Sequence, residues 1–189
     1  HGQIPNRTFT THAMNEKERI EHHMYHDSQI AQLLHDEHLR TIDLMNRLEE
    51  ATSGRRAKSA PADDDTAAKL LLADLHAELQ GTAEHHFSFE EENIFPALMA
   101  IGDVGIPTIL RQEHALLRNV SETLLPLVER AREGGFTEPD WLEFRDLALD
   151  LVERHITHIQ KEEMGLLPAL SSLFDAEAAS ELVIRYAEK

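Results

Sequence analysis

The sequence contains no cysteine among its 189 residues, and this absence excludes several kinds of site. Without thiols the chain can form neither a disulfide framework nor a thiolate-bound zinc site, and an all-cysteine iron–sulfur cluster is excluded as well. Any metal ion that this protein binds must therefore take nitrogen and oxygen ligands.

Positive charge is scarce, because 18 Lys and Arg residues face 35 Asp and Glu residues and give a formal net charge of -17. A chain of this charge repels the phosphates of nucleic acids and of anionic membranes. No apolar run approaches the roughly 20 residues that span a bilayer, and the first residues lack the pattern of a secretory signal. We therefore expect no nucleic acid and no membrane as partner, and a cytoplasmic location.

Aromatic residues make up only 5% of the chain, and apolar and polar residues rarely alternate, so the signals for β-strands are weak. Apolar residues instead recur every three to four positions, which is typical of amphipathic helices. This spacing predicts four long helices, at about residues 28–50, 66–94, 107–132 and 138–166. Short connections between them favour an all-α, up-down-up-down four-helix bundle, followed by a short C-terminal helix.

We expect a single folded core, since 189 residues suffice for one and are few for two. The predicted bundle covers residues 28–174, and the predicted tail helix covers residues 175–189. Residues 1–27 form a predicted N-terminal arm. Because the chain begins with His, we interpret residues 1–13 as a segment foreign to the protein, with Met14 as a candidate start.

Histidine is abundant, with 13 residues, and several of them stand in a repeated motif. The stretches "HHFSFEEENIFPAL" (85–98) and "THIQKEEMGLLPAL" (157–170) share a His, a pair of Glu and a Pro at the same places. The preceding helices also repeat, since "DEHLRTIDLMNRLEE" aligns with "QEHALLRNVSETLLP". The chain therefore consists of two similar helical hairpins, and the alignment pairs His38 with His114, His86 with His158, Glu90 with Glu162, and Pro96 with Pro168.

In each motif the His and the first Glu are four residues apart, so on a helix they lie one turn from each other on the same face. That face is also the apolar stripe, which points both side chains into the bundle. A buried imidazole or carboxylate loses its hydration, so burial of these groups is unfavourable unless each has a partner such as a metal ion. The sequence therefore predicts a metal site with six protein ligands: His38, His86, Glu90, His114, His158 and Glu162.

Six such ligands suit a pair of transition-metal ions, each bound by two imidazoles, with the two carboxylates bridging between them. Iron fits this mixture best, while manganese and zinc are alternatives. The predicted cofactor is two non-haem iron ions, bridged by the carboxylates and an oxo group.

Further ionisable residues lie near these ligands in the sequence, and we predict that they orient the ligands through hydrogen bonds. The alternative is that they are solvated surface residues. This second set comprises His35, His155, Glu91, Glu163, Glu37 and Glu113. His85 adjoins His86 but is turned off the inner face of the helix, so we interpret it as a surface residue.

At these residues the sequence resembles the hemerythrin-like family, also known as HHE cation-binding domains. The resemblance runs from about Ile30 to Leu170 and rests on the doubled pattern H-x-x-x-E-E-x-x-[IL]-[FL]-P. It implies a four-helix bundle with a non-haem di-iron centre that binds dioxygen, or that reacts with nitric oxide or peroxide. The family's ligands then fall on the same six residues.

One position departs from the oxygen-carrying members of that family. They have a fifth His four residues after the first His of the third helix, where this sequence has Arg118. The set of four His and two Glu is more similar to the branch associated with iron–sulfur cluster repair and nitrosative stress, and to sensing domains. Repair proteins usually carry a Cys-bearing N-terminal domain, however, and this chain has no Cys.

Four functions therefore stay open at the level of the sequence. The first is a di-iron protein that binds or senses a small ligand, O2 or NO. The second is a redox enzyme that reduces peroxide or NO at the metals, with a redox partner that the sequence does not specify. The third is a protein that holds or donates iron, as in cluster repair, and the fourth is a structural metal site, such as a zinc site.

Overall fold

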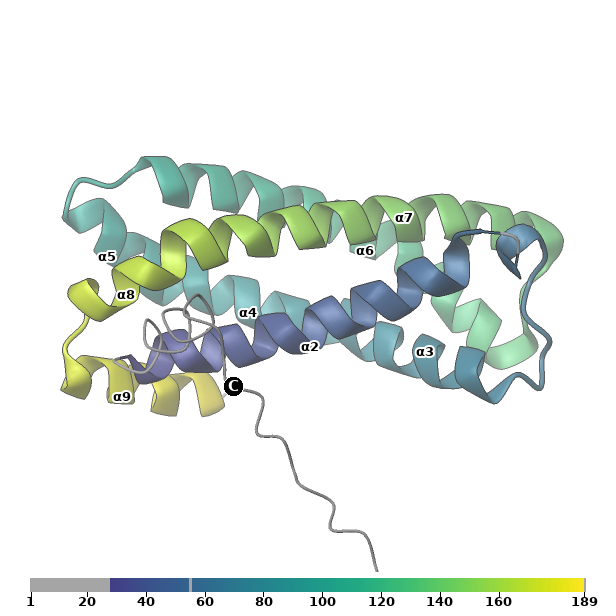
Figure 1. Ribbon diagram of the computed structural model, residues 1–189, viewed down its shortest axis with the longest axis horizontal. Helices are drawn as coiled ribbons and strands as arrows, with labels where there is room; N and C mark the ends of the chain where they lie inside the picture. Colours follow the sequence, from purple (N-terminus) through teal and green to yellow (C-terminus); the bar gives the residue numbers. More distant parts are fainter. Residues whose placement is uncertain (1–27, 55, 189) are drawn as a thin grey trace, which may run out of the picture.

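The computed structural model describes residues 28–54 and 56–188, and the regular elements in these two stretches are all helical. The predicted all-α class is confirmed. The long helices lie side by side as the four rods of an elongated bundle (Figure 1). The predicted N-terminal arm, residues 1–27, lies outside the described residues.

Several of the rods are composed of more than one element. The first rod is α2 (Gln29–Thr52), and the short turn η1 (Arg56–Lys58) follows it. The second contains α3 (Thr66–Ala77), η2 (Glu78–Thr82), α4 (Ala83–Phe89), η3 (Glu90–Ile94) and α5 (Phe95–Ala100). The third is α6 (Gly105–Gly134), and the fourth contains α7 (Glu138–Lys161), η4 (Glu162–Leu166) and α8 (Leu167–Leu173), before the tail helix α9 (Ala176–Ala187). We call α2 to α5 the first hairpin and α6 to α8 the second hairpin.

Short polar side chains begin the helices where the sequence predicts. Ser28, Asp65 and Thr137 each accept a hydrogen bond from the backbone N–H three residues ahead, which satisfies a group that the helix itself leaves unpaired. After α6 the chain turns at Gly135, whose φ is 76°. A Cβ atom there would lie 2.1 Å from Asp63 Oδ1, so the turn requires glycine.

Pro96 and Pro168, which lie two residues after the predicted helix ends at about residues 94 and 166, do not end the second and fourth rods. Each rod passes through one π-helical turn, η3 or η4, and continues as α5 or α8. In η3 the N–H of Phe95 bonds the carbonyl of Glu90, five residues back. This wider turn accommodates a proline, which lacks an N–H and clashes with a regular helix. The two turns begin at predicted metal ligands, Glu90 and Glu162.

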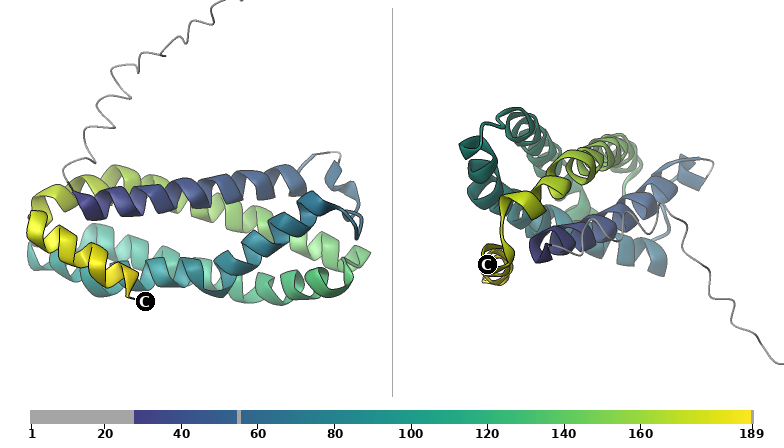
Figure 2. Two further views of the ribbon diagram at one scale, coloured as in Figure 1. Left: turned by 90° about the horizontal axis from the view of Figure 1, so that it is seen from below. Right: turned by 60° about the vertical axis from the view of Figure 1, so that its left-hand side comes forward.

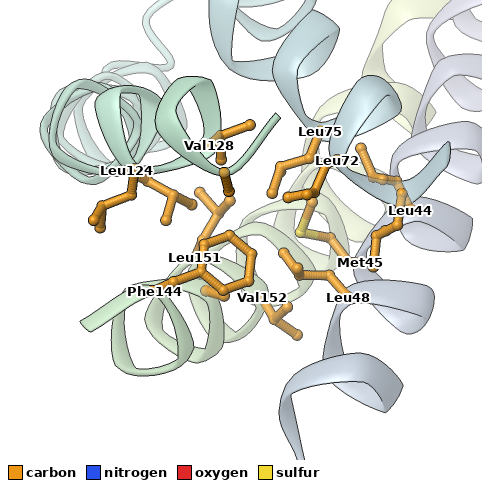
Figure 3. Packing of buried hydrophobic residues seen from close by; sticks show 14 of the residues in the cluster. Leu44, Met45, Leu48, Leu72, Leu75, Leu124, Val128, Phe144, Leu151 and Val152 are labelled. Atoms are coloured by element: carbon orange, nitrogen blue, oxygen red, sulfur yellow. The ribbon is translucent and has the colours of Figure 1, made fainter. Parts of the chain in front are cut away.

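Buried apolar side chains form two clusters along the bundle. Figure 3 shows the first, where residues such as Leu48, Leu75 and Phe144 meet from different rods. The second contains Leu34 and Phe95. Each large side chain buried in this way stabilises the fold by about 1.5 to 3 kcal/mol. The predicted His and Glu ligands lie along the rods between the two clusters, so apolar packing shields this polar layer on both sides.

The tail helix α9 packs along α2 on the outside of the bundle (Figure 2). Its buried residues Ala179, Leu182 and Tyr186 join the second apolar cluster. Among the helices of the described stretches, none combines the length and the apolar character that crossing a bilayer requires.

Candidate metal centre

The six predicted ligands gather in the polar layer, one His from each rod and one Glu from each of the π turns η3 and η4. All six are buried, and Glu90, His114 and Glu162 are 0% exposed. Their potential ligand atoms form two groups, and within each group these atoms lie within 4.8 Å of one another. One group comprises His38, His86, Glu90 and Glu162, and the other comprises Glu90, His114, His158 and Glu162.

Glu90 and Glu162 belong to both groups because each presents one carboxylate oxygen to each side. Glu162 Oε2 lies 3.0 Å from His38 Nε2, and Glu162 Oε1 lies 2.8 Å from His158 Nε2. Glu90 Oε1 lies 3.4 Å from His86 Nε2, and Glu90 Oε2 lies 3.4 Å from His114 Nε2. Two carboxylates therefore stand between two pairs of imidazoles, as bridging ligands of a two-metal site would.

Many of these donor atoms face one another without forming hydrogen bonds among the described residues. His38 Nε2 and all four carboxylate oxygens of Glu90 and Glu162 are buried and make no hydrogen bond of good geometry within the described part of the chain. His114 Nε2 and His158 Nε2 face each other at 3.1 Å. Buried polar atoms without partners destabilise a fold, and a cation between them would satisfy them. The residues of this layer therefore fit a pair of metal ions.

Each of the four His holds its other ring nitrogen against a separate Glu on a neighbouring rod. A Glu that accepts a hydrogen bond from Nδ1–H fixes the tautomer of the imidazole, so that Nε2 presents its lone pair to the centre. These are the four Glu of the predicted second set. The Nδ1–Oε distances are 2.5 Å for His38 with Glu163, 3.0 Å for His86 with Glu37, 2.7 Å for His114 with Glu91, and 3.0 Å for His158 with Glu113.

Further polar side chains hold these four Glu in turn. Arg118 and Lys161 could be predicted from the sequence, because a cation three or four residues after a predicted ligand lies on nearly the same helix face. Tyr186 could not be predicted in this way, since it belongs to the tail helix α9 and not to a helix that carries a ligand. The contacts are Arg118 with Glu91, Lys161 with Glu113, Tyr186 with Glu37, and His35, which belongs to the predicted second set, with Glu163.

The carboxylates around the imidazoles favour positive charge on them. Burial by itself lowers the pKa of His38, but the carboxylates of Glu162 and Glu163, which lie next to its two ring nitrogens, outweigh this effect and raise the pKa to about 9. The pKa of His114 is raised to about 9 as well, because Glu162 and Glu90 outweigh the effect of burial. The electrostatics of the site therefore favour a cation at the imidazoles, either a proton or a metal ion.

Two His residues differ from their predicted roles. His155, predicted as a hydrogen-bond partner or a partly exposed residue, is 3% exposed, and its Nδ1 has no hydrogen-bond partner among the described residues. Burial, and then the charge of His158, lower its pKa to about 3, so the imidazole stays neutral. His85, predicted at the surface, is half-buried, because its ring packs on Tyr186 with 4.3 Å between the ring centroids.

Arg118 occupies the place of the fifth His and directs its guanidinium group to two carboxylates. Its Nε lies 2.6 Å from Glu84 Oε2, and its Nη1 lies 2.9 Å from Glu91 Oε1. The guanidinium carbon also lies 5.7 Å from the centre of the Phe87 ring. Arg118 thus supports a Glu that orients a His, and it adds no nitrogen ligand to the centre.

An all-helical bundle with buried groups of His and Glu that could hold metal ions defines a cation-binding protein of the helical-bundle class. A sequence model of the hemerythrin HHE cation-binding domain matches residues 29–170, which is well over half of the chain. The protein therefore belongs to the hemerythrin HHE family. A search of individually curated proteins found no match to the chain.

Proposed function

We propose that this protein is a non-haem di-iron protein that binds or senses a small ligand, O2 or NO, at the centre between the four rods. The observation that supports this proposal is the position of Glu90 and Glu162, each of which presents one oxygen to either pair of His. A single metal ion would leave one pair of imidazoles without a cation. Two ions use all six ligands.

The donor set favours iron over a structural zinc ion. Each group offers two imidazole nitrogens and two carboxylate oxygens. Four donors saturate the tetrahedral zinc of a structural site, whereas iron commonly takes more ligands and keeps positions open in sites of mixed imidazole and carboxylate. Bound iron would supply these open positions and the capacity for electron transfer. The protein contributes fixed imidazole tautomers, through the outer Glu residues, and an apolar surrounding in which Phe87 stacks on His114.

A redox enzyme that acts on peroxide or NO is the second candidate, and one observation favours it. A cavity lined by His86, His158 and Glu162 reaches the centre, so a substrate could approach the metals there. An enzyme needs such a space for its substrate. The iron-donor alternative predicts iron that exchanges readily with a chelator.

An absorption spectrum of protein loaded anaerobically with ferrous iron, together with a metal count, tests the proposal. We expect about two irons per chain, with a new visible band on addition of O2 or NO that disappears when the gas is removed. Steady turnover of peroxide or NO with a reductant would favour the enzyme instead. A preparation that retains only zinc, or iron that shows no response to either gas, would contradict the proposal.

A further inference from the structure

A cavity of about 540 Å3 reaches the candidate metal centre from the side of the first hairpin. Its walls come from α2, from the second rod, and from α7 and η4 of the fourth rod. The predicted ligands His86, His158 and Glu162 are among the residues that line it. A small molecule in this cavity can therefore approach metal ions at the centre.

The corresponding space in the second hairpin is smaller and does not reach the centre. It measures about 260 Å3, and its lining includes Leu117 and Asp150. Its walls, as far as the structure describes the chain, include none of the six predicted ligands. In the first hairpin the counterpart of Leu117 is the smaller Thr41, and the counterpart of Asp150 is Glu78, which lies in the π turn η2. These local differences leave the centre accessible from the first hairpin.

Most polar side chains on the walls of the larger cavity already have partners within the protein. Arg47, near the surface, pairs with Asp43 and Asp74 at 3.0 and 2.9 Å. The hydroxyl group of Thr41 donates a hydrogen bond to Glu78 at 3.3 Å. The other side chains with such partners are Glu37, Arg40 and Thr82. None of these groups, charged or neutral, requires a ligand in the cavity to satisfy it.

His155 is the exception among these wall residues. It is 3% exposed, and its buried Nδ1 makes no hydrogen bond within residues 28–54 and 56–188. It also belongs to neither group of potential metal ligands. A buried polar atom without a partner destabilises a fold, so its presence calls for an explanation. A molecule in the cavity can supply the missing partner.

His155 lies close to the metal centre. It precedes His158 by one turn of α7, and side chains three residues apart on a helix have Cβ atoms about 5 to 6 Å apart. Both imidazoles pack near Phe87, whose ring centroid lies 6.1 Å from that of His155 and 5.6 Å from that of His158. The counterpart of His155 in the first hairpin is Ala83, a small residue that lines the same cavity. The cavity therefore has a single imidazole of this kind, next to space that a small molecule can occupy.

We propose that small ligands bind to the metal ions from this cavity, and that His155 donates a hydrogen bond to the bound ligand. The ligand class is a molecule of two or three atoms that binds a metal through one end and accepts a hydrogen bond at the other, such as O2, NO or azide. A neutral imidazole carries one N–H group, which serves as the donor. This inference rests on the proposed function for the metal ions at the centre.

Azide tests this hydrogen bond, because its infrared stretching band responds to a donor at the end that does not bind the metal. The protein is loaded with iron, or with zinc if iron is not retained, and the band is recorded in H2O and in D2O. We expect a shift of the band in D2O for the wild type and no shift for His155→Leu. The variant should also bind azide about tenfold more weakly. His155→Gln keeps an N–H donor and should restore part of both effects. Equal shifts and equal affinities in the wild type and His155→Leu would overturn the assignment.

His76→Leu is the matched control for this experiment. His76 lies on α3, pairs with Glu129 at 3.6 Å, and is not one of the residues that line the cavity. Neither His76 nor His155 belongs to a group of potential metal ligands, so both Leu variants should retain the full metal content. An equal loss of azide affinity in His76→Leu, or a loss of metal in His155→Leu, would contradict the role of His155 as a donor to the ligand.

Substitutions that fill the cavity test whether the ligand binds from this side. Thr41→Leu copies the second hairpin and should weaken azide binding about tenfold, because the larger side chain takes up the space. Ala83→Leu fills the same cavity from the second rod and serves if the first variant folds poorly. Thr157→Leu is the control, since Thr157 is exposed and lines the smaller space. Unchanged binding in the two cavity variants, or an equal loss in the control, would contradict the assignment.

Metal counts on the same samples separate this inference from the proposed function. If the iron-loaded wild type binds O2 or NO reversibly but azide does not depend on His155, the inference is wrong and the proposed function stands. If the protein retains only zinc and the zinc-bound azide shows the shift that depends on His155, the proposed function is wrong and the inference stands. A protein that binds no metal overturns both, and a metal-loaded protein that binds no azide overturns the inference.

Discussion

The two hairpins carry the same predicted ligands but differ in the residues around them. Both supply two His and one Glu to the centre, and both place a Glu behind each His. Around this shared set, Thr41 corresponds to Leu117, Ile42 to Arg118, and the position of His155 is Ala83 in the first hairpin. The comparison suggests that the metal chemistry demands symmetry of the ligands, whereas access to the centre requires that the surroundings differ.

Removal of a shared ligand should have the largest effect. Glu162 belongs to both groups of potential ligands and His114 belongs to one, so Glu162→Ala should lose most of the bound metal and His114→Ala about half of it. The measurement is metal per chain by elemental analysis, with circular dichroism to verify that each variant is folded. Glu122→Ala, at an exposed position of α6, is the control. Full metal content in Glu162→Ala would contradict the bridging role.

Acid should destabilise the second hairpin through His155, a residue that the first hairpin lacks. The unfolded chain binds a proton at this His below about pH 6.5, whereas the folded protein keeps it neutral down to its pKa of about 3. The stability that this neutral His contributes is therefore complete above pH 6.5 and is lost as the pH falls toward 3.

Urea unfolding of metal-free protein at pH 6 and pH 4 measures this contribution. Between these values the wild type should lose about 2 to 3 kcal/mol more unfolding free energy than His155→Leu. Parallel losses in the two proteins would show that His155 is protonated in the fold.

The outer carboxylates should matter equally in the two hairpins. Glu37→Gln and Glu113→Gln each keep a hydrogen-bond acceptor but remove the negative charge behind His86 or His158. Loss of such a partner typically weakens metal binding about 10- to 100-fold. Competition with a chelator measures the affinity, and Glu122→Gln is the control. A large effect in one hairpin and none in the other would mean that only one of the two positions holds a metal tightly.

The tail helix should contribute the smallest effect, and only to the first hairpin. Tyr186→Phe removes the hydroxyl group that donates to Glu37 and should lower the free energy of unfolding by about 1 kcal/mol. A double-mutant cycle with Glu37→Gln isolates this contact. Additive effects of the two substitutions would show that the contact contributes nothing.

Much of the centre could be predicted from the sequence, because the spacing of His86 and Glu90 places both on one helix face and the repeat does the same for His158 and Glu162. The pairing of Glu37 with His86 could not, since the partner of a side chain depends on how neighbouring rods are rotated. The burial of His155 was missed for a similar reason, as a His on the edge of an apolar stripe can face either solvent or a neighbouring helix.

The sequence by itself determined the helices, the division into two hairpins and the residues available to bind metal ions, because these follow from periodicities of three to four residues along one chain. Tertiary structure decided which oxygen of Glu90 or Glu162 faces which His, which Glu lies behind each imidazole, and which space reaches the centre. These features depend on contacts between helices that are far apart in the sequence, where the size of one side chain, Thr41 or Leu117, helps to open or close a path.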